Sequence, residues 1–292
     1  MRVDAGLSIH AMGSLRTGFL RVRETCGSMK NLSMIAGLTD IGRALVRQRL
    51  CYELALEDLR DRYRRTIFGL LWICLSFLLF VLVKNIVFST LSDRDPAYFF
   101  TYMTVGFAIW TFMQSVLTEG SNCYNLSRFW ILGTNLPYFL YICRYIYRAA
   151  IEFLLVMATA LAACLLIGRI ELAGLAWFVP VLAFYMLTAV GAIMLLAPLA
   201  VLFPDVVHAV RSVMRVMFFA TPIIWVPVEG TVLETVALYN PFTHYIALLR
   251  GPLLGEPVAA ASLAVCAAGT GFLLLAGLFA FSNSRRSIAY LI

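Results

Sequence analysis

The chain has 292 residues, of which 62% are hydrophobic and 13% charged, and its mean hydropathy of +0.87 excludes an ordinary soluble domain. The formal net charge of +7 does not indicate nucleic-acid binding, because 12 of the 23 lysines and arginines lie within residues 1–66, ahead of the first long apolar segment. We therefore expect an integral membrane protein whose basic region contacts anionic membrane lipids.

Two segments precede the apolar part of the chain. Residues 1–38 mix Gly, Ser, Thr, Arg and Met without a period, and we expect a poorly ordered cytoplasmic extension. Residues 39–66 differ, because Leu45, Tyr52 and Leu59 recur at spacings that share one helical face. We predict an amphipathic helix at the membrane interface; a helix packed on soluble protein is the alternative.

Four arginines lie directly before the first apolar segment: Arg60, Arg62, Arg64 and Arg65. Arginines at the end of a membrane span favour the cytoplasmic side of the bilayer. We therefore predict a cytoplasmic N-terminus. The orientation of every later segment follows by alternation, so six spans also place the C-terminus inside.

Six apolar segments have the length of about 20 residues that a membrane span requires. They are residues 67–90, 98–118, 137–167, 172–203, 206–226 and 258–281. The third and fourth are longer than a bilayer needs, so we expect them to tilt or to project into the cytoplasm. The predicted fold class is an all-α membrane protein, with a transmembrane domain at 67–283 and a cytoplasmic tail at 284–292.

Two connections carry features of their own. Residues 119–136 have a Ser-Asn pair at 121–122 as a helix start and a Gly-Thr-Asn-Leu-Pro stop at 133–137, which predicts a short amphipathic helix on the cytoplasmic side. Such a helix, which we call the peg (residues 119–136), suits contact with a separate motor domain. An ordinary structured loop is the alternative. Residues 229–256 hold an apolar patch broken by Arg250, Gly251 and Pro252. It is too short to cross, so we predict a re-entrant segment in the outer leaflet.

Aromatic side chains are dense in the predicted spans. Sugars place their C–H faces against aromatic rings, so an aromatic-lined channel suits a glycan, whereas packing or interfacial anchoring is the simpler explanation for any single ring. The candidates for lining such a channel are Trp72, Phe77, Phe80, Phe218 and Phe219.

Charges inside the predicted spans need an explanation. Lys84 lies near the outer end of the first span, where it either extends its ammonium to the headgroups or contacts a substrate in a pore. Arg148 and Glu152 are four residues apart in the third span. We predict that they form a structural ion pair rather than part of a proton relay.

The chain lacks the motifs of several chemistries. Neither Lys30 nor Lys84 follows a glycine, so no phosphate-binding loop is present and the chain is not itself a P-loop ATPase. Seven cysteines include no C-x-x-C pair, and three histidines no H-E-x-x-H motif. We expect no metal, no bound cofactor and no catalytic residues.

Four groups of residues occur in a fixed order along the chain. They are Arg-Tyr-Arg-Arg-Thr-Ile-Phe-Gly at 62–69 with Trp72, Phe-Pro-Asp-Val at 203–206, Thr-Pro-Ile-Ile-Trp at 221–225, and Tyr-Asn-Pro-Phe at 239–242 with Arg-Gly-Pro-Leu-Leu-Gly at 250–255. Together they resemble the permease subunits of type-2 ABC (ABC-2) exporters of bacterial polysaccharides, most closely the Wzm-type O-antigen permeases. The resemblance covers the chain from about Leu45 onward. The family usually has a basic residue where Pro204 stands.

This resemblance implies an ATP-driven exporter of lipid-linked polysaccharide, of O-antigen or capsule type, in the bacterial inner membrane. The chain would form a homodimer with the pore between protomers, and two copies of a separate, Wzt-like ATPase would bind ATP and Mg²⁺. The four arginines at 60–65 would meet the pyrophosphate of the lipid carrier. The ATPase would contact Glu119, Ser121, Asn122, Tyr124, Asn125 and Arg128.

Two other functions fit the sequence less well. An ABC-2 permease for a small lipid or drug has the same architecture. A multispan glycosyl- or acyltransferase needs a concentrated catalytic set. The only candidates on the outer side lack the spacing of a site, and they are Asp93, Asp95, Glu229, Glu234 and His244.

Overall fold

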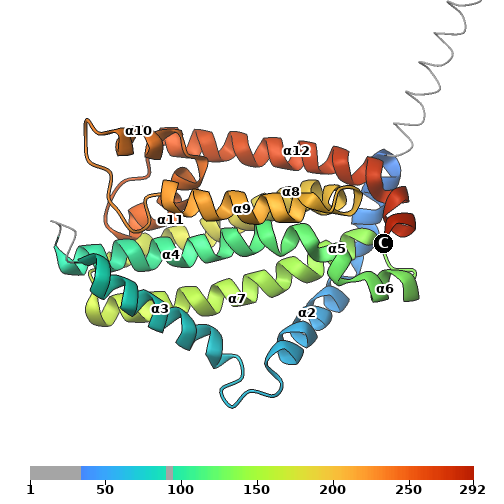
Figure 1. The fold of residues 1–292 in the computed structure, drawn as a ribbon, viewed down its shortest axis with the longest axis horizontal. Helices are drawn as coiled ribbons and strands as arrows, with labels where there is room; N and C mark the ends of the chain where they lie inside the picture. Colours follow the sequence, from blue (N-terminus) through green and yellow to red (C-terminus); the bar gives the residue numbers. More distant parts are fainter. Residues whose placement is uncertain (1–33, 90–94) are drawn as a thin grey trace, which may run out of the picture.

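The computed structural model describes residues 34–89 and 95–292, and its regular structure is helical throughout these ranges, without a strand (Figure 1). Most of the predicted extension, at residues 1–33, and the loop at 90–94 lie outside the described residues. Five helical stretches are long and apolar enough to span a membrane: Leu71–Ser89, Pro96–Gly133, Tyr138–Ile167, Leu172–Leu202 and Ala260–Arg285. The prediction of an all-α membrane protein is confirmed at this level.

The N-terminal part of the described chain is two helices rather than one. A helical segment at 34–46 ends in a turn at Arg47, and α2 follows at Gln48–Tyr63. The buried residues of α2 are Cys51, Leu54, Ala55 and Leu59, and this helix packs against α7 (Tyr138–Ile167). The first of the two helices starts at residue 34, before the predicted boundary at residue 39.

An elbow separates α2 from α3, which spans Leu71–Ser89 (Figure 1). Gly69 has φ +53° in this elbow, a backbone conformation that costs glycine little and other residues more. The two helices diverge into a V, and α3 rests on α4 (Pro96–Thr118) and α7. It buries only Phe77 and Val81 within the chain.

The core of the bundle is formed by α4, α7, α8 (Phe178–Leu202) and α12 (Ala260–Leu291). Helices α8 and α12 approach most closely at two glycines: a Cβ at Gly277 would lie 2.5 Å from the carbonyl oxygen of Gly191. A 3₁₀ helix at Leu172–Trp177 leads into α8. The predicted tail after residue 283 is not a separate segment, because α12 continues through it to Leu291.

The fifth predicted span, at 206–226, contains a helix of only 16 residues, α9 at Asp205–Ala220. The chain leaves the helix at Thr221-Pro222, because proline excludes the preceding residue from helical backbone angles. Two short helices follow at the same end of the bundle, α10 (Val232–Tyr239) and α11 (Pro241–Leu253) (Figure 1).

Buried polar groups fix the irregular segment after α9. The Asn240 amide donates to the carbonyl oxygen of Ala220 at 3.2 Å and accepts from the backbone N–H of Phe242 at 3.0 Å. Arg250 and the Tyr102 hydroxyl both donate to the carbonyl oxygen of Pro222, at 2.7 and 3.1 Å. Polar carbonyls freed by the end of a helix are thereby satisfied within the protein.

The opposite end of the bundle carries the predicted peg at 119–136. It consists of three short pieces: a 3₁₀ turn at Gly120–Asn122, α5 at Cys123–Leu126 and α6 at Arg128–Gly133. The end of α12 and the helical segment at 34–46 lie at the same end (Figure 1).

Candidate functional site

Four charged side chains meet where α2, α4 and α7 come together. Arg62 lies 3.2 Å from Glu152 and 3.3 Å from Glu119, and Arg148 lies 2.7 Å from Glu119 and 3.9 Å from Glu152. We call these four residues the ion cluster. Burial works to lower the pKa of Arg62, but the charges of Glu119 and Glu152 outweigh it and raise that pKa above its ordinary value. Arg62 is therefore held as a cation by two carboxylates.

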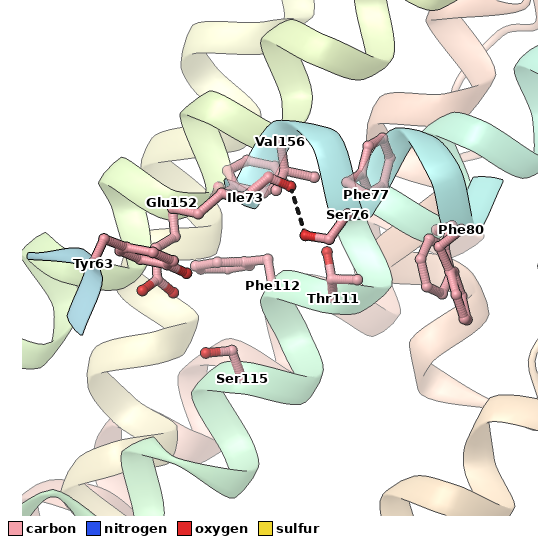
Figure 2. A pocket seen from close by; sticks show the side chains of 12 residues that line it. Tyr63, Ile73, Ser76, Phe77, Phe80, Thr111, Phe112, Ser115, Glu152 and Val156 are labelled. Atoms are coloured by element: carbon pink, nitrogen blue, oxygen red, sulfur yellow. Dashed lines mark hydrogen bonds between the residues drawn. The ribbon is translucent and has the colours of Figure 1, made fainter. Parts of the chain in front are cut away.

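On one side of the ion cluster lies a pocket of about 370 Å³ between α3, α4 and α7 (Figure 2). We call it the aromatic pocket. Its lining residues are Tyr63, Ile73, Ser76, Phe77, Phe80, Phe107, Thr111, Phe112, Ser115, Glu152, Phe153 and Val156. Five phenylalanine rings from α3, α4 and α7 line its wall, while hydroxyl groups and one carboxylate supply the polar part.

Two hydroxyls of the aromatic pocket already donate within the protein. Ser76 and Thr111 donate to the carbonyl oxygens of Trp72 and Ala108 in their own helices. Their oxygens still have lone pairs that can accept from a ligand. The aromatic rings can pack against the C–H faces of a sugar, and the hydroxyl oxygens beside them can accept hydrogen bonds from the sugar's own hydroxyl groups.

On the other side of the ion cluster lies a pocket of about 380 Å³, which we call the arginine pocket. It is lined by Asp58, Arg62, Glu119, Asn122, Cys123, Leu126, Ser127, Tyr141, Arg144, Tyr145, Arg148 and Arg211. Four guanidinium groups thus face two carboxylates. Arg144 donates through Nε to Asp58 at 2.7 Å and forms a second, shorter contact with the same carboxylate.

The structure does not bring the four predicted arginines together in one pocket. Arg62 lies in the ion cluster and lines the arginine pocket. Arg60, Arg64 and Arg65 are exposed and line neither pocket. Three other arginines, at 144, 148 and 211, take their place in the pocket. Their spacing along the chain carried no signal of this, because they come from two helices that are far apart in sequence.

The predicted ATPase contacts are divided between core and surface. Ser121 and Tyr124 are buried, and the Tyr124 side chain is fully enclosed. Glu119 belongs to the ion cluster. Asn125 and Arg128 are exposed and free to meet another protein, whereas Asn122 is half-buried and lines the arginine pocket.

Of the aromatic residues predicted to line a channel, some line the aromatic pocket and others are exposed outside both pockets. Phe77 and Phe80 line the aromatic pocket and stack on Phe107, with ring centroids 5.9 and 4.7 Å apart. Trp72 and Phe219 are exposed and lie outside both pockets.

The ammonium of Lys84 lies among rings from three helices. It is 4.1 Å from the centroid of Phe80, 4.4 Å from Phe107 and 4.3 Å from Phe218. Cations are attracted to the faces of aromatic rings at such distances. Lys84 therefore links α3 to α4 and α9, a role that the sequence did not indicate because Phe107 and Phe218 are distant in the chain.

The sequence matches no protein-family model, and a search of curated proteins finds no match either.

Proposed function

We propose that this chain is the transmembrane subunit of an ATP-driven exporter that moves a lipid-linked polysaccharide, of O-antigen or capsule type, out across a bacterial inner membrane. Its N- and C-termini would face the cytoplasm. In this proposal two copies form the passage and two copies of a separate ABC ATPase supply the energy. The number of spans would be six, with α9 and the segment at 221–226 as the fifth and α10 and α11 as re-entrant helices.

The observation that carries the proposal is the pair of pockets that meet at the ion cluster. One is rich in guanidinium groups and the other is walled by aromatic rings with hydroxyl acceptors. A lipid-linked glycan has a phosphate end and a sugar end. The arginine pocket suits the phosphate end, and the aromatic pocket suits the sugar end. A hydrophobic drug has no group that requires the arginines, which favours the glycan.

The proposed motor contact uses the end of the molecule where α5 and α6 lie. Asn125 and Arg128 are exposed there, together with the side chains of Phe129 and Trp130. Large aromatic side chains and arginine are the residues that most often anchor a protein interface. Glu119 lies at the base of this peg and belongs to the ion cluster, so movement of the peg would reach the pockets directly.

The test is an export assay in proteoliposomes that contain the chain and its ATPase, with a fluorescent lipid-linked glycan as the substrate. We expect ATP-dependent appearance of glycan on the far side, and little transport of a hydrophobic dye. Phe80→Ala removes a ring from the aromatic pocket, and we expect export to fall by about two- to twelvefold, equivalent to the ~0.5–1.5 kcal/mol of an aromatic contact.

Phe279→Ala is the matched control, because Phe279 is an exposed ring on α12 that lines neither pocket. Export by this variant should equal that of the unchanged chain. Appreciable ATP hydrolysis by the chain without its partner would overturn the proposal, and so would covalent change of the glycan during incubation, which indicates a transferase.

A further inference from the structure

The arginine pocket holds more positive charge than its own carboxylates balance. Arg144 is paired with Asp58, and Arg62 and Arg148 share Glu119 and Glu152. Arg211, from α9, is the fourth guanidinium of the lining. Among the described residues no carboxylate lies within 4.0 Å of it. Arg211 is exposed, and no carboxylate of the described residues pairs with its charge.

A second feature is an unsatisfied donor on another arginine of the lining. Among the described residues the buried Nε of Arg148 has no hydrogen-bond partner, and the carboxylate of Glu152 lies 3.9 Å from it. Buried donors are nearly always satisfied, so an unsatisfied one marks a place for a ligand oxygen or a water. Asn122 adds a further donor: its Oδ1 accepts from Asn125, which leaves its own amide hydrogens available at the pocket.

We infer that the arginine pocket binds the phosphoryl oxygens of an anionic ligand through Arg144, Arg148 and Arg211. Guanidinium groups bind phosphate oxygens with two parallel hydrogen bonds, and donors from two helices surround such an anion better than donors from one. Arg144 and Arg148 are four residues apart on α7 and so lie on the same face of that helix. Arg211 approaches from α9, and the anion would bridge the two helices.

The exposed arginines at 60, 64 and 65 are not part of this site. They line neither pocket, whereas Arg211, which is also exposed, lines the arginine pocket. The identity of the ligand as the phosphate end of a lipid-linked glycan rests on the proposed function. The anion site itself does not, because it follows from the charges and donors of the pocket.

Asp58 competes with the anion in this arrangement. It occupies the guanidinium of Arg144 through two contacts. Replacing its charge with a neutral amide of the same shape leaves Arg144 free to bind phosphate. A purely structural pocket would be weakened by this change, whereas an anion site gains affinity from it.

Binding is measured on the full-length chain in nanodiscs with three probes: a fluorescent polyprenyl pyrophosphate, the corresponding polyprenol, and inorganic pyrophosphate as competitor. We expect the pyrophosphate lipid to bind and the polyprenol not to bind. Arg211→Gln should weaken binding roughly tenfold or more, as expected for the loss of a charge-assisted hydrogen bond. Asp58→Asn should tighten it several-fold.

Arg215→Gln is the matched control. Arg215 lies one turn further along α9, donates to Ser212 at 3.2 Å and lines neither pocket. It removes the same charge from the same helix, so it should change binding by less than about twofold. Equal effects of the two variants, binding of polyprenol as tight as that of the pyrophosphate lipid, or weaker binding by Asp58→Asn would each overturn the site.

The competitor identifies the source of the phosphate. Displacement of the lipid by an equal concentration of inorganic pyrophosphate supports the site with a free anion as its ligand, and failure of displacement supports the site with a lipid headgroup as its ligand. The export assay is a separate measurement. If Arg211→Gln loses binding but the unchanged chain exports no glycan, the anion site is supported and the proposed export function is rejected. If Arg211→Gln binds normally but the unchanged chain does export glycan, the export function is supported and the anion site is rejected.

Discussion

Charged side chains of this protein are held by partners from other helices. Arg62 of α2 contacts carboxylates on α4 and α7, Arg144 contacts Asp58, and Arg285 of α12 lies 3.0 Å from Asp40. Of these pairs, only Arg285–Asp40 has a carboxylate almost wholly buried, and removing the partner of a buried charge costs about 3–5 kcal/mol; the pairs of the more exposed Arg62 contribute less. These contacts therefore fix how the helices at this end of the bundle sit against one another.

Asp40 shows how one such residue joins three elements. Its carboxylate accepts from the backbone N–H of Phe139 at 2.9 Å, at the start of α7, and pairs with Arg285. Arg285 also donates to the carbonyl oxygen of Ala36 at 2.6 Å. Burial raises the pKa of Asp40 from its usual 3.8, although the bond from Phe139 and the charge of Arg285 lower it in part.

The raised pKa of Asp40 predicts a pH dependence of stability. The folded state binds this proton more tightly than the unfolded state, so the stabilisation is complete below pH 3.8 and is lost as pH rises through the folded-state pKa. Asp40→Asn keeps the acceptor for Phe139 and removes the titration. We expect the variant to lose less stability than the unchanged chain as pH rises from about 4 toward neutrality.

The measurement is the thermal unfolding midpoint of the purified chain in detergent, taken at intervals from acid to neutral pH. The useful quantity is the difference between the two proteins, because other carboxyls titrate in both. A difference that does not change with pH would contradict the assignment. Glu53→Gln serves as the control, since Glu53 is exposed and its ion pair among the described residues is with exposed Arg49.

Sequence spacing could predict contacts within one helix and no others. The i, i+4 spacing of Arg148 and Glu152 predicted their pairing, and the structure has it at 3.9 Å. The stronger contacts of the same cluster come from Arg62 and Glu119, which lie 57 residues apart in the chain. Nothing local in the sequence marks these two as partners, because their proximity depends on how α2 packs on α7.

At the scale of helices, apolar length predicted most of the bundle. The spans at 98–118, 137–167 and 172–203 correspond closely to α4, α7 and α8. Length could not predict where helices end in polar surroundings. The break at Arg47 divides a helix that the sequence pattern left continuous, and α12 continues to Leu291, ten residues beyond the predicted apolar segment that ends at Phe281.

The α8–α12 interface depends on small residues. A Cβ at Gly277 would lie 2.5 Å from the carbonyl oxygen of Gly191 and 3.0 Å from the Cβ of Met194. Backbone cannot yield as a side chain can, so the helices would have to separate. Close approach through small residues is a usual source of affinity between membrane helices.

Gly277→Ala should therefore destabilise the protein, by about 1–3 kcal/mol for an overpacked contact. Gly271→Ala is its control on the same helix, because a Cβ at Gly271 meets nothing within 4 Å. That change should be neutral or slightly stabilising, since alanine favours a helix by about 1 kcal/mol over glycine. The thermal unfolding midpoints of the two variants are measured in detergent, with size-exclusion chromatography as the detection method. Equal midpoints would show that the helix contact is not tight.

At the scale of the whole molecule, α3 is the helix least covered by the rest of the chain. It is one of five helices apolar enough to span a membrane, yet it buries only two residues. Ile86 on α3 is 71% exposed, and Phe219 on α9 is 69% exposed. The apolar character of these surfaces was plain from the sequence. Which of them meets lipid and which meets protein was not, because lipid and a second copy accept the same side chains.

The proposed homodimer allows a measurement of which exposed apolar surface contacts a second copy and which contacts lipid. If α3 and α9 form the contact between two copies, Ile86→Cys and Val216→Cys should each give a dimer when native membranes are treated with a short bis-maleimide. Leu275→Cys on α12 is the control, since Leu275 is 73% exposed and belongs to a helix that packs on α8 at the other side of the core. We expect no cross-linked dimer from that position beyond the background of the unchanged chain, whose own cysteines remain. Cross-linking from α12 alone would place the contact on the opposite surface and remove the passage between α3 and α9. In that case the aromatic pocket, which α3 closes on one side, would open to lipid instead of to a second copy.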